Sequence, residues 1–147
     1  MGSKAKEFRP EQVINGTWGE VWLDGEYLAQ VTALKAEVTI KTTAISMVQK
    51  LRDGQKMTGM EQKGELKLHK INSHIMKKMS KAFKRGKMMT CTIVSNIKDP
   101  DGLGGERVAL YDCLFDKVVL VDWEAGKMGS ESYSFTFDDW EILQSIK

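Results

Sequence analysis

Alternation of apolar and polar residues in the last third of the chain constrains the fold more than any other feature. Between Glu106 and Ile142 the sequence reads as two long strands folded back on each other, joined by a polar loop from Glu124 to Gly129 that contains two glycines. Side chains two positions apart in a strand share a face. One face of the first strand would therefore consist of Ala109, Tyr111, Cys113, Phe115, Val119, Val121 and Trp123.

The return strand has the cleaner pattern. Its aromatic face consists of Tyr133, Phe135 and Phe137, and its hydroxyl face of Ser132, Ser134 and Thr136. The first strand is apolar on one face and mixed on the other, so the pair needs partner surfaces on both sides. We expect another copy of the chain to supply part of that partner surface.

Further strands precede this pair. Asp24-Gly25 predicts a tight hairpin turn, because both residues tolerate the positive φ angles that a two-residue turn demands. Alternation from Leu34 to Ile40 and from Thr90 to Ser95 predicts two more strands. Between Gly59 and Lys70, a charged face alternates with a mostly apolar one. The charged face consists of Glu61, Lys63, Glu65, Lys67 and His69, and the opposite face of Met60, Gln62, Gly64, Leu66 and Leu68. The charged face is either a solvated surface or the wall of a channel.

One segment has the period of a helix. Asn72 or Ser73 can cap its start, and Gly86 can end it in the left-handed conformation. Its apolar stripe consists of Ile75, Met76, Met79, Ala82 and Phe83, and its basic residues are Lys77, Lys78, Lys81, Lys84 and Arg85. No aromatic residues are interleaved with these lysines, so a solvated outer face is favoured over a nucleic-acid patch.

Two segments fit no regular element. From Thr42 to Thr58 the pattern predicts a long loop carrying apolar residues, which favours a docking surface, with a helix over the core as the alternative. Residues 1–15 form a polar N-terminal arm, either disordered or ordered on a neighbouring subunit, before a domain spanning 16–147.

Composition limits the class of protein. A chain of 147 residues with 41% hydrophobic and 29% charged residues is typical of a single soluble globular domain. The net charge of +2 is too small to indicate nucleic-acid binding by itself. No apolar run reaches the ~18 residues of a membrane span, and we expect no signal peptide. Cys91 and Cys113 are expected to be small buried residues in a reducing compartment.

Residue patterns for catalysis or metal binding are not recognisable. His69 and His74 lie on different expected elements, without a neighbouring Cys-X-X-Cys pair. The glycines from Gly102 to Gly105 lack the spacing and the lysine of a phosphate-binding loop. We therefore expect no catalytic residue, cofactor or metal site. A site assembled from distant positions stays open, and a deep pocket that gathers carboxylates or His69 would support it.

Four segments carry a family resemblance. They are Gly16 to Glu26, Met57 to Lys70, Glu106 to Asp116, and Ser134 to Trp140 with its Phe-Thr-Phe-Asp-Asp-Trp ending. In this order and spacing the chain resembles the tail tube proteins of contractile-tailed phages, PBSX-like prophages and related phage-tail-like bacteriocins. Between Ile45 and Gln55 the chain follows the family pattern only loosely.

The resemblance implies an antiparallel β-sandwich or partial barrel with one helix, which forms hexameric rings stacked into a hollow tube inside a contractile sheath. The long loop would reach the next ring. Its candidate inter-ring contacts are Ile45, Met47, Val48, Leu51 and Met57, and the candidate lumen residues are Glu61, Lys63, Glu65 and Lys67.

The same resemblance implies partners and a location. The partners are further copies of the chain, the tail sheath and the baseplate, with DNA only as transient cargo and no stable membrane insertion. The product would be a virion tail or tail-like particle that is assembled in the bacterial cytoplasm and conducts DNA or ions. The alternatives are a monomeric module that binds nucleic acid through the basic helix, and an enzyme.

Overall fold

The computed structural model describes residues 7–71 and 73–146, which form a mainly antiparallel β fold with one α-helix. In chain order the elements are the 3-10 helices Pro10–Gln12 and Gly16–Trp18, then β1 (Gly19–Leu23), β2 (Glu26–Tyr27), β3 (Val31–Ile45), β4 (Gly54–His69), α1 (His74–Lys84), β5 (Thr90–Lys98), β6 (Gly105–Phe115), β7 (Ser130–Thr136) and β8 (Asp139–Gln144).

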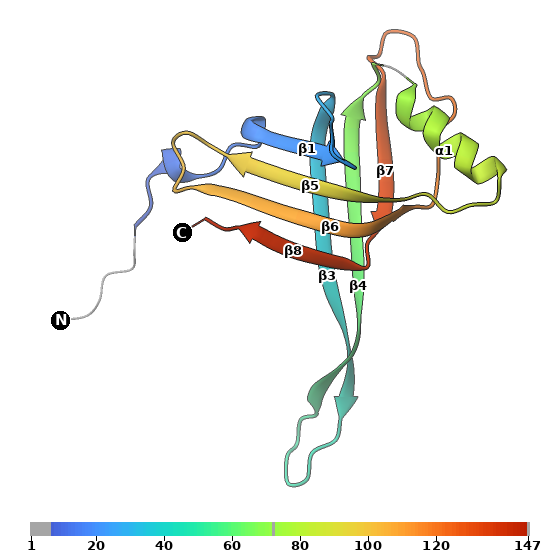
Figure 1. Cartoon of the computed structure of the whole chain (residues 1–147). Coiled ribbons are helices and arrows are strands. Elements are labelled where there is room, and N and C mark those ends of the chain that lie inside the picture. Colours follow the sequence, from blue (N-terminus) through green and yellow to red (C-terminus); the bar gives the residue numbers. More distant parts are fainter. Residues whose placement is uncertain (1–6, 72, 147) are drawn as a thin grey trace.

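The strands form one sheet that bends into two layers. Its order is β2-β1-β5-β6-β7-β4-β3, and β8 pairs with β6. β6 meets β7 only through the pairs Leu114–Thr136 and Phe115–Phe135. At this corner the sheet folds over, so that β1, β5, β6 and β8 run across β3, β4 and β7 (Figure 1). The core lies between the layers, and α1 covers one end of it with Ile75 and Met79.

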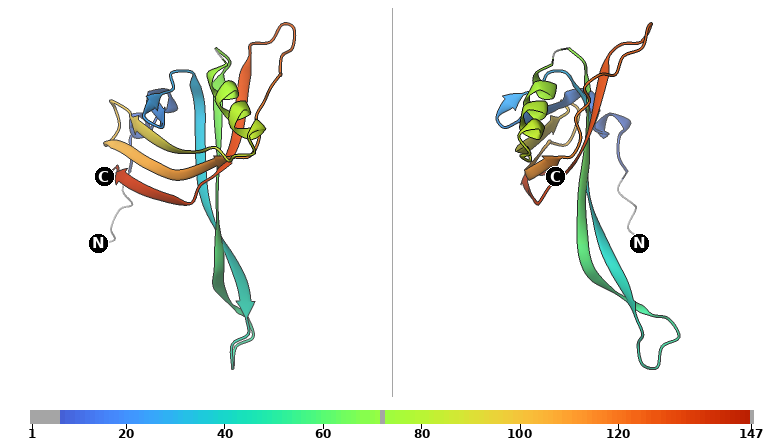
Figure 2. Two further views of the ribbon diagram at one scale, coloured as in Figure 1. Left: turned by 45° about the vertical axis from the view of Figure 1, so that its right-hand side comes forward. Right: turned by 90° about the vertical axis from the view of Figure 1, so that its right-hand side faces the viewer.

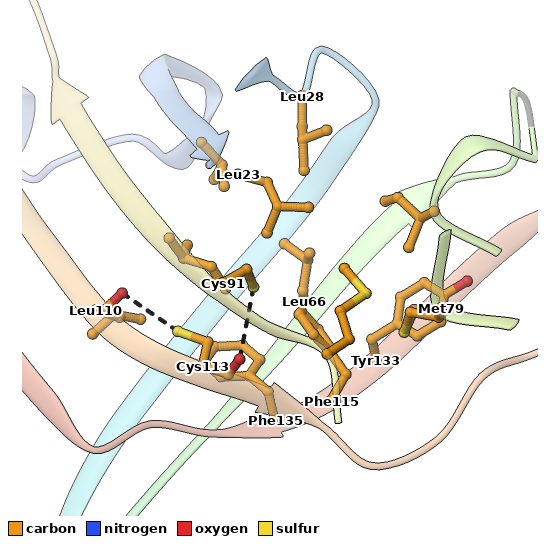
Figure 3. Close-up of a cluster of buried hydrophobic side chains, with 14 of the residues drawn as sticks. Leu23, Leu28, Leu66, Met79, Cys91, Leu110, Cys113, Phe115, Tyr133 and Phe135 are labelled. Carbon is orange, nitrogen blue, oxygen red and sulfur yellow. Dashed lines mark hydrogen bonds between the residues drawn. The ribbon is translucent and has the colours of Figure 1, made fainter. Parts of the chain in front are cut away.

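Aromatic side chains hold the two layers together at the corner. The rings of Phe115 from β6 and Tyr133 meet edge to face, with their centroids 6.1 Å apart, and the Phe115 centroid lies 5.5 Å from that of Phe135 (Figure 3). All three are at most 2% exposed. Burying one such side chain contributes on the order of 1.5–3 kcal/mol, so this cluster is a main source of stability for the body of the domain.

Several local predictions are confirmed. Asp24 and Gly25 have φ angles of 50° and 83° and form the tight turn between β1 and β2. Gly86, with φ of 68°, follows the end of α1. Ser73 is the N-cap residue, but its side chain makes no capping hydrogen bond, and Asn72 lies outside the described residues.

The predicted pairing of two long C-terminal strands is confirmed only in part. Residues 107–115 pair antiparallel with residues 135–144, through β8 and the end of β7. The first strand ends at Phe115, and residues 116–129 form a loop. β7 pairs along its whole length with β4, from Lys63 to His69. Beyond Phe115 the chain leaves the sheet and packs Val118 and Val119 against the core from the loop.

The predicted face of that first strand is also divided. A bulge at Asp112, whose φ is 53°, shifts the register between β5 and β6. Cys113 and Phe115 therefore join Leu110 in the core cluster, while Ala109 is buried outside it. One extra residue in a strand reverses the faces of everything beyond it.

The predicted long loop is mostly a hairpin. β3 and β4 stay paired as far as Ile45–Gly54, so only residues 46–53 form a loop, and no helix covers the core there. The β-branched run Thr39 to Thr43 favours a strand. Pairing also satisfies backbone groups that a loop of this length would leave to water.

Gly64 offers a test of this packing. It lies opposite Phe135, and a Cβ atom there would come within 2.3 Å of Phe135 Cζ and 2.9 Å of the Lys35 carbonyl oxygen. We expect Gly64→Ala to lower the free energy of unfolding by about 1–3 kcal/mol in urea denaturation, because the core is overpacked. Gly59→Ala on the same strand is the control, since its nearest neighbour is Lys41 Cδ at 4.0 Å. Equal stability of the two variants would contradict this packing.

Candidate self-assembly surfaces

The β3–β4 hairpin projects far beyond the body of the domain (Figure 2). None of the 15 residues of β3 is buried, and in the 16-residue β4 only Leu66 and Leu68 are. Both of these buried residues lie near the end of β4 that packs on the core. Val31 and Leu34 of β3 also pack against the core, and β4 pairs with β7 from Lys63 to His69. Beyond this base the hairpin is held by its own backbone pairing, and its side chains are mostly exposed.

One face of the hairpin is charged. The register places Lys35 opposite Glu65 and Glu37 opposite Lys63. Ion pairs also form along each strand: Lys35 Nζ lies 2.9 Å from Glu37 Oε1, and Lys63 Nζ lies 2.7 Å from Glu61 Oε1. The hydrogen bond from Lys63 lowers the pKa of Glu61, and the same bond raises the pKa of Lys63. These groups are exposed, so their pairing balances the charge of the face more than it stabilises the fold.

The charged face continues onto β7. Ser132 pairs with Lys67 in the sheet, and its hydroxyl donates a hydrogen bond to Glu65 Oε1 at 2.7 Å. The predicted lumen candidates Glu61, Lys63, Glu65 and Lys67 therefore lie together on one polar face of the β3-β4-β7 layer. Their role in a lumen stays a prediction.

The opposite face of the hairpin is apolar. It begins at Leu66, which is in the core, and at Leu34, which packs against the core. Toward the tip it continues with Val38, Ile40 and Met60, which are 40%, 55% and 47% exposed. The five predicted inter-ring contact residues lie beyond these. Met47, Val48 and Leu51 are in the tip loop, Ile45 and Met57 are on the strands behind it, and all five are exposed. We refer to residues 46–53 as the hairpin tip.

A second exposed apolar segment was missed by the sequence analysis. In the loop of residues 116–129, Leu120, Val121, Trp123 and Met128 are 60%, 76%, 81% and 93% exposed. The sequence predicts Val121 and Trp123 on the apolar face of a strand, Leu120 on its mixed face, and Met128 in the connecting loop. The charges of Asp116 and Lys117, placed directly after the apolar β6, were the available signal that the strand had ended.

The sheet also has unpaired edges. β3 pairs only with β4, so among the described residues its other edge is open over its full length. β7 pairs with β4 on one side and meets β6 on the other only at Phe135 and Thr136. Open edges present rows of unpaired N–H and C=O groups that template pairing with another chain.

The basic helix has its own surroundings. Lys78 Nζ lies 3.7 Å from Asp24 Oδ2, which ties the helix to the β1–β2 turn. Lys77, Lys81 and Lys84 surround a shallow hollow of about 320 Å³ beside Leu120 of the loop. The helix therefore presents its lysines outward next to apolar loop residues.

The described residues hold no obvious chemical centre. Within residues 7–71 and 73–146, no three His, Cys, Asp or Glu side chains gather as metal ligands would. Cys91 and Cys113 face each other across β5 and β6 as free thiols, and the prediction that both are buried is confirmed. The two histidines lie on different elements. His69 is on β4, and His74 begins α1, with its Nε2 atom 3.4 Å from Glu26 Oε2.

Comparison with known proteins gives the family. The family model described as phage tail tube protein matches residues 6–144. The phage-like element PBSX protein XkdM of Bacillus subtilis (strain 168) is 28% identical over 141 residues, covering 94% of this chain and 95% of XkdM. The uncharacterized protein YqbM of the same strain is 28% identical over 142 residues, covering 95% and 96% of the two chains.

A solved structure has the same fold. A chain in the cryo-EM structure of an extracellular contractile injection system, the PVC sheath/tube terminator in the extended state, gives a TM-score of 0.73. It is 7% identical and covers 95% of this chain and 100% of that chain. The chain belongs to the phage tail tube protein family. Among the described residues, no α-helix is long and apolar enough to cross a membrane.

The hairpin tip can be removed to test whether it serves the fold. Because Ile45 and Gly54 are direct partners, Asn-Gly in place of residues 46–53 closes the hairpin with a two-residue turn. We expect the free energy of unfolding of the monomer to change by no more than about 0.5 kcal/mol in urea denaturation, since every residue of the tip is exposed. A loss of several kcal/mol would mean that the tip supports the body.

Proposed function

We propose that this chain is the structural subunit of the inner tube of a contractile tail, in which hexameric rings stack end to end. The observation that carries the proposal is the open β3-β4-β7 layer, with an unpaired edge on β3 and a mostly unpaired edge on β7. Family membership supports it independently.

Ring formation would complete these edges. β3 and β7 both run antiparallel to β4 and are therefore parallel to each other. The β3 edge of one copy and the β7 edge of the next copy in a ring would pair as parallel strands. Three strands from each of six copies would close a barrel of at least ~18 strands, the size at which barrels enclose an aqueous channel. Closure removes the exposed edges that invite aggregation.

The polar face of this layer would line the channel. Glu61, Lys63, Glu65 and Lys67 alternate in sign, and Ser132 and Ser134 on β7 add neutral hydroxyl groups. A mixed wall allows DNA or ions to pass, whereas a strongly basic wall would hold phosphates and release counterions on binding. DNA is thus transient cargo rather than a ligand.

Stacking would use the hairpin tip. Met47, Val48 and Leu51, backed by Ile45 and Met57, are too exposed to serve the isolated fold. Burial against the next ring accounts for them.

Sheath and baseplate proteins would contact the outside of the tube, in a tail or tail-like particle assembled in the bacterial cytoplasm. This is a mechanical role and requires no catalytic residue.

Tip substitutions test the stacking role. The double variant Met47→Asp, Leu51→Asp should leave the monomer folded, with an unchanged circular dichroism spectrum, but prevent tube formation in negative-stain electron microscopy. Its control is Met47→Leu, Leu51→Met, which keeps the apolar contact and should assemble normally. Normal tubes from the aspartate variant would remove these residues from the contact.

Cysteine labelling tests the lining of the channel. In assembled tubes, the thiol of Lys63→Cys should react with a small maleimide but be protected from a bulky polymer-linked maleimide that cannot enter the channel. Lys84→Cys on the outer helix should react with both, and Cys91 and Cys113 stay silent because they are buried. Equal reaction of the two variants with the bulky reagent would place Lys63 outside the lumen.

A further inference from the structure

The hairpin tip and the loop of residues 116–129 lie at opposite ends of the molecule. β4 runs from Gly54 at the tip to His69, which pairs with Ser130, and Lys70 N donates to Gly129 O at 2.9 Å. The loop therefore ends where β4 ends, and Figures 1 and 2 place the two segments at opposite extremes. At about 3.3 Å per residue, the strand separates them by roughly 50 Å.

The loop forms an apolar groove at its end of the molecule. The groove measures about 260 Å³, lies between residues 119–123 and the start of β7, and is also lined by Lys70 and Glu131. Trp123 lines it and is 81% exposed, and Met128, which precedes the lining residue Gly129 in the chain, is 93% exposed. Large apolar side chains that are exposed together mark a surface that another molecule covers.

The charges of the two segments are complementary. The hairpin tip, residues 46–53, carries the basic Lys50 and Arg52 against the acidic Asp53, and Lys56 follows on β4. Residues 116–129 carry three acidic residues, Asp116, Asp122 and Glu124, against two lysines. Lys127 Nζ is engaged by Glu124 Oε2 at 3.0 Å. Asp122 lies beside Trp123 and lines the groove. In the lining of the groove, Lys70 Nζ forms an ion pair with Glu131, so Asp122 leaves the lining with a net negative charge. This charge and the net positive charge of the tip attract each other.

From this arrangement we infer that the groove receives the hairpin tip of a second copy, with Leu51 or Met47 against Trp123 and Arg52 near Asp122. A molecule cannot bring its own tip to its own groove, because roughly 50 Å of β4 separates them. A contact between unlike surfaces of identical copies gives an open-ended stack when its rotation does not close into a ring, and surfaces at opposite ends of the molecule favour the stack. This inference rests on the proposed tube function and names the receptor for its tip.

The groove variant Trp123→Asp, Met128→Asp tests the inference directly. Both positions are exposed, so the fold should be unchanged by circular dichroism and thermal unfolding. Single rings should form but not stack, whereas the control Trp123→Phe, Met128→Leu should give normal tubes. If the groove variant stacks normally while the tip aspartate variant does not, the tip docks elsewhere: this inference fails and the proposed function stands. If the unaltered chain forms no tubes at any concentration, both fail.

Mixing preformed rings tests the polarity of the contact. Rings of the tip variant keep an intact groove, and rings of the groove variant keep an intact tip. Their mixture should give pairs of rings and nothing longer in electron microscopy. Single rings only, or long mixed tubes, would contradict a contact between one tip and one groove.

A charge exchange tests the predicted neighbours. Arg52→Asp should weaken stacking at low salt, and adding Asp122→Arg in the same chain should restore it, since the pair is re-formed with reversed sign. The matched control adds Asp101→Arg instead, at an exposed acidic residue in the β5–β6 turn, and should not restore stacking. Equal restoration by both second substitutions would overturn the pairing of Arg52 with Asp122.

Discussion

An unpaired strand edge is the constraint on which this structure depends. β3 is 15 residues long and hydrogen-bonds to β4 on one side, and within residues 7–71 and 73–146 no strand pairs with its other side. Water can satisfy those backbone groups in the free chain, but a long, regular edge also templates pairing with other chains. In the ring that we propose, each such edge would be completed by the edge of a neighbouring copy.

The molecule separates the parts that fold it from the parts that project. The bent sheet encloses the aromatic cluster of Phe115, Tyr133 and Phe135, and α1 covers one end of the core. The outer hairpin and the loop of residues 116–129 contribute little to that core and expose their apolar side chains. Substitutions in the two regions should therefore have different consequences: core changes alter unfolding, and changes at the projections alter assembly.

Sequence patterns predicted the faces of the sheet better than its pairing. Alternation correctly separated the buried Leu66 and Leu68 from the charges of Glu65 and Lys67. The same reasoning extended β6 past Phe115, because periodicity contains no information on whether a neighbouring strand is present. The bulge at Asp112 was equally invisible, since it depends on the register with β5. Conversely, the paired strands beyond Thr42 looked like a loop because neither face of that hairpin is buried in its own chain.

The candidate surfaces were predictable to a similar extent. The exposed apolar residues between Ile45 and Met57 stood out in the sequence because they lacked a regular pattern. Trp123 did not stand out, because its neighbours alternate as a strand would. The role that we propose for Trp123 rests on the folded structure, in which its loop lies at the end of β4 opposite the hairpin tip.

Hydrogen exchange along β3 is the most direct measurement of the central claim. In an antiparallel pair, alternate amides of a strand bond to the partner and the others point away from it. The account predicts that the outward amides of β3 exchange rapidly in the free protein and become protected in assembled tubes, while the amides bonded to β4 are protected in both. Outward amides that exchange equally fast in tubes and in free protein would contradict it.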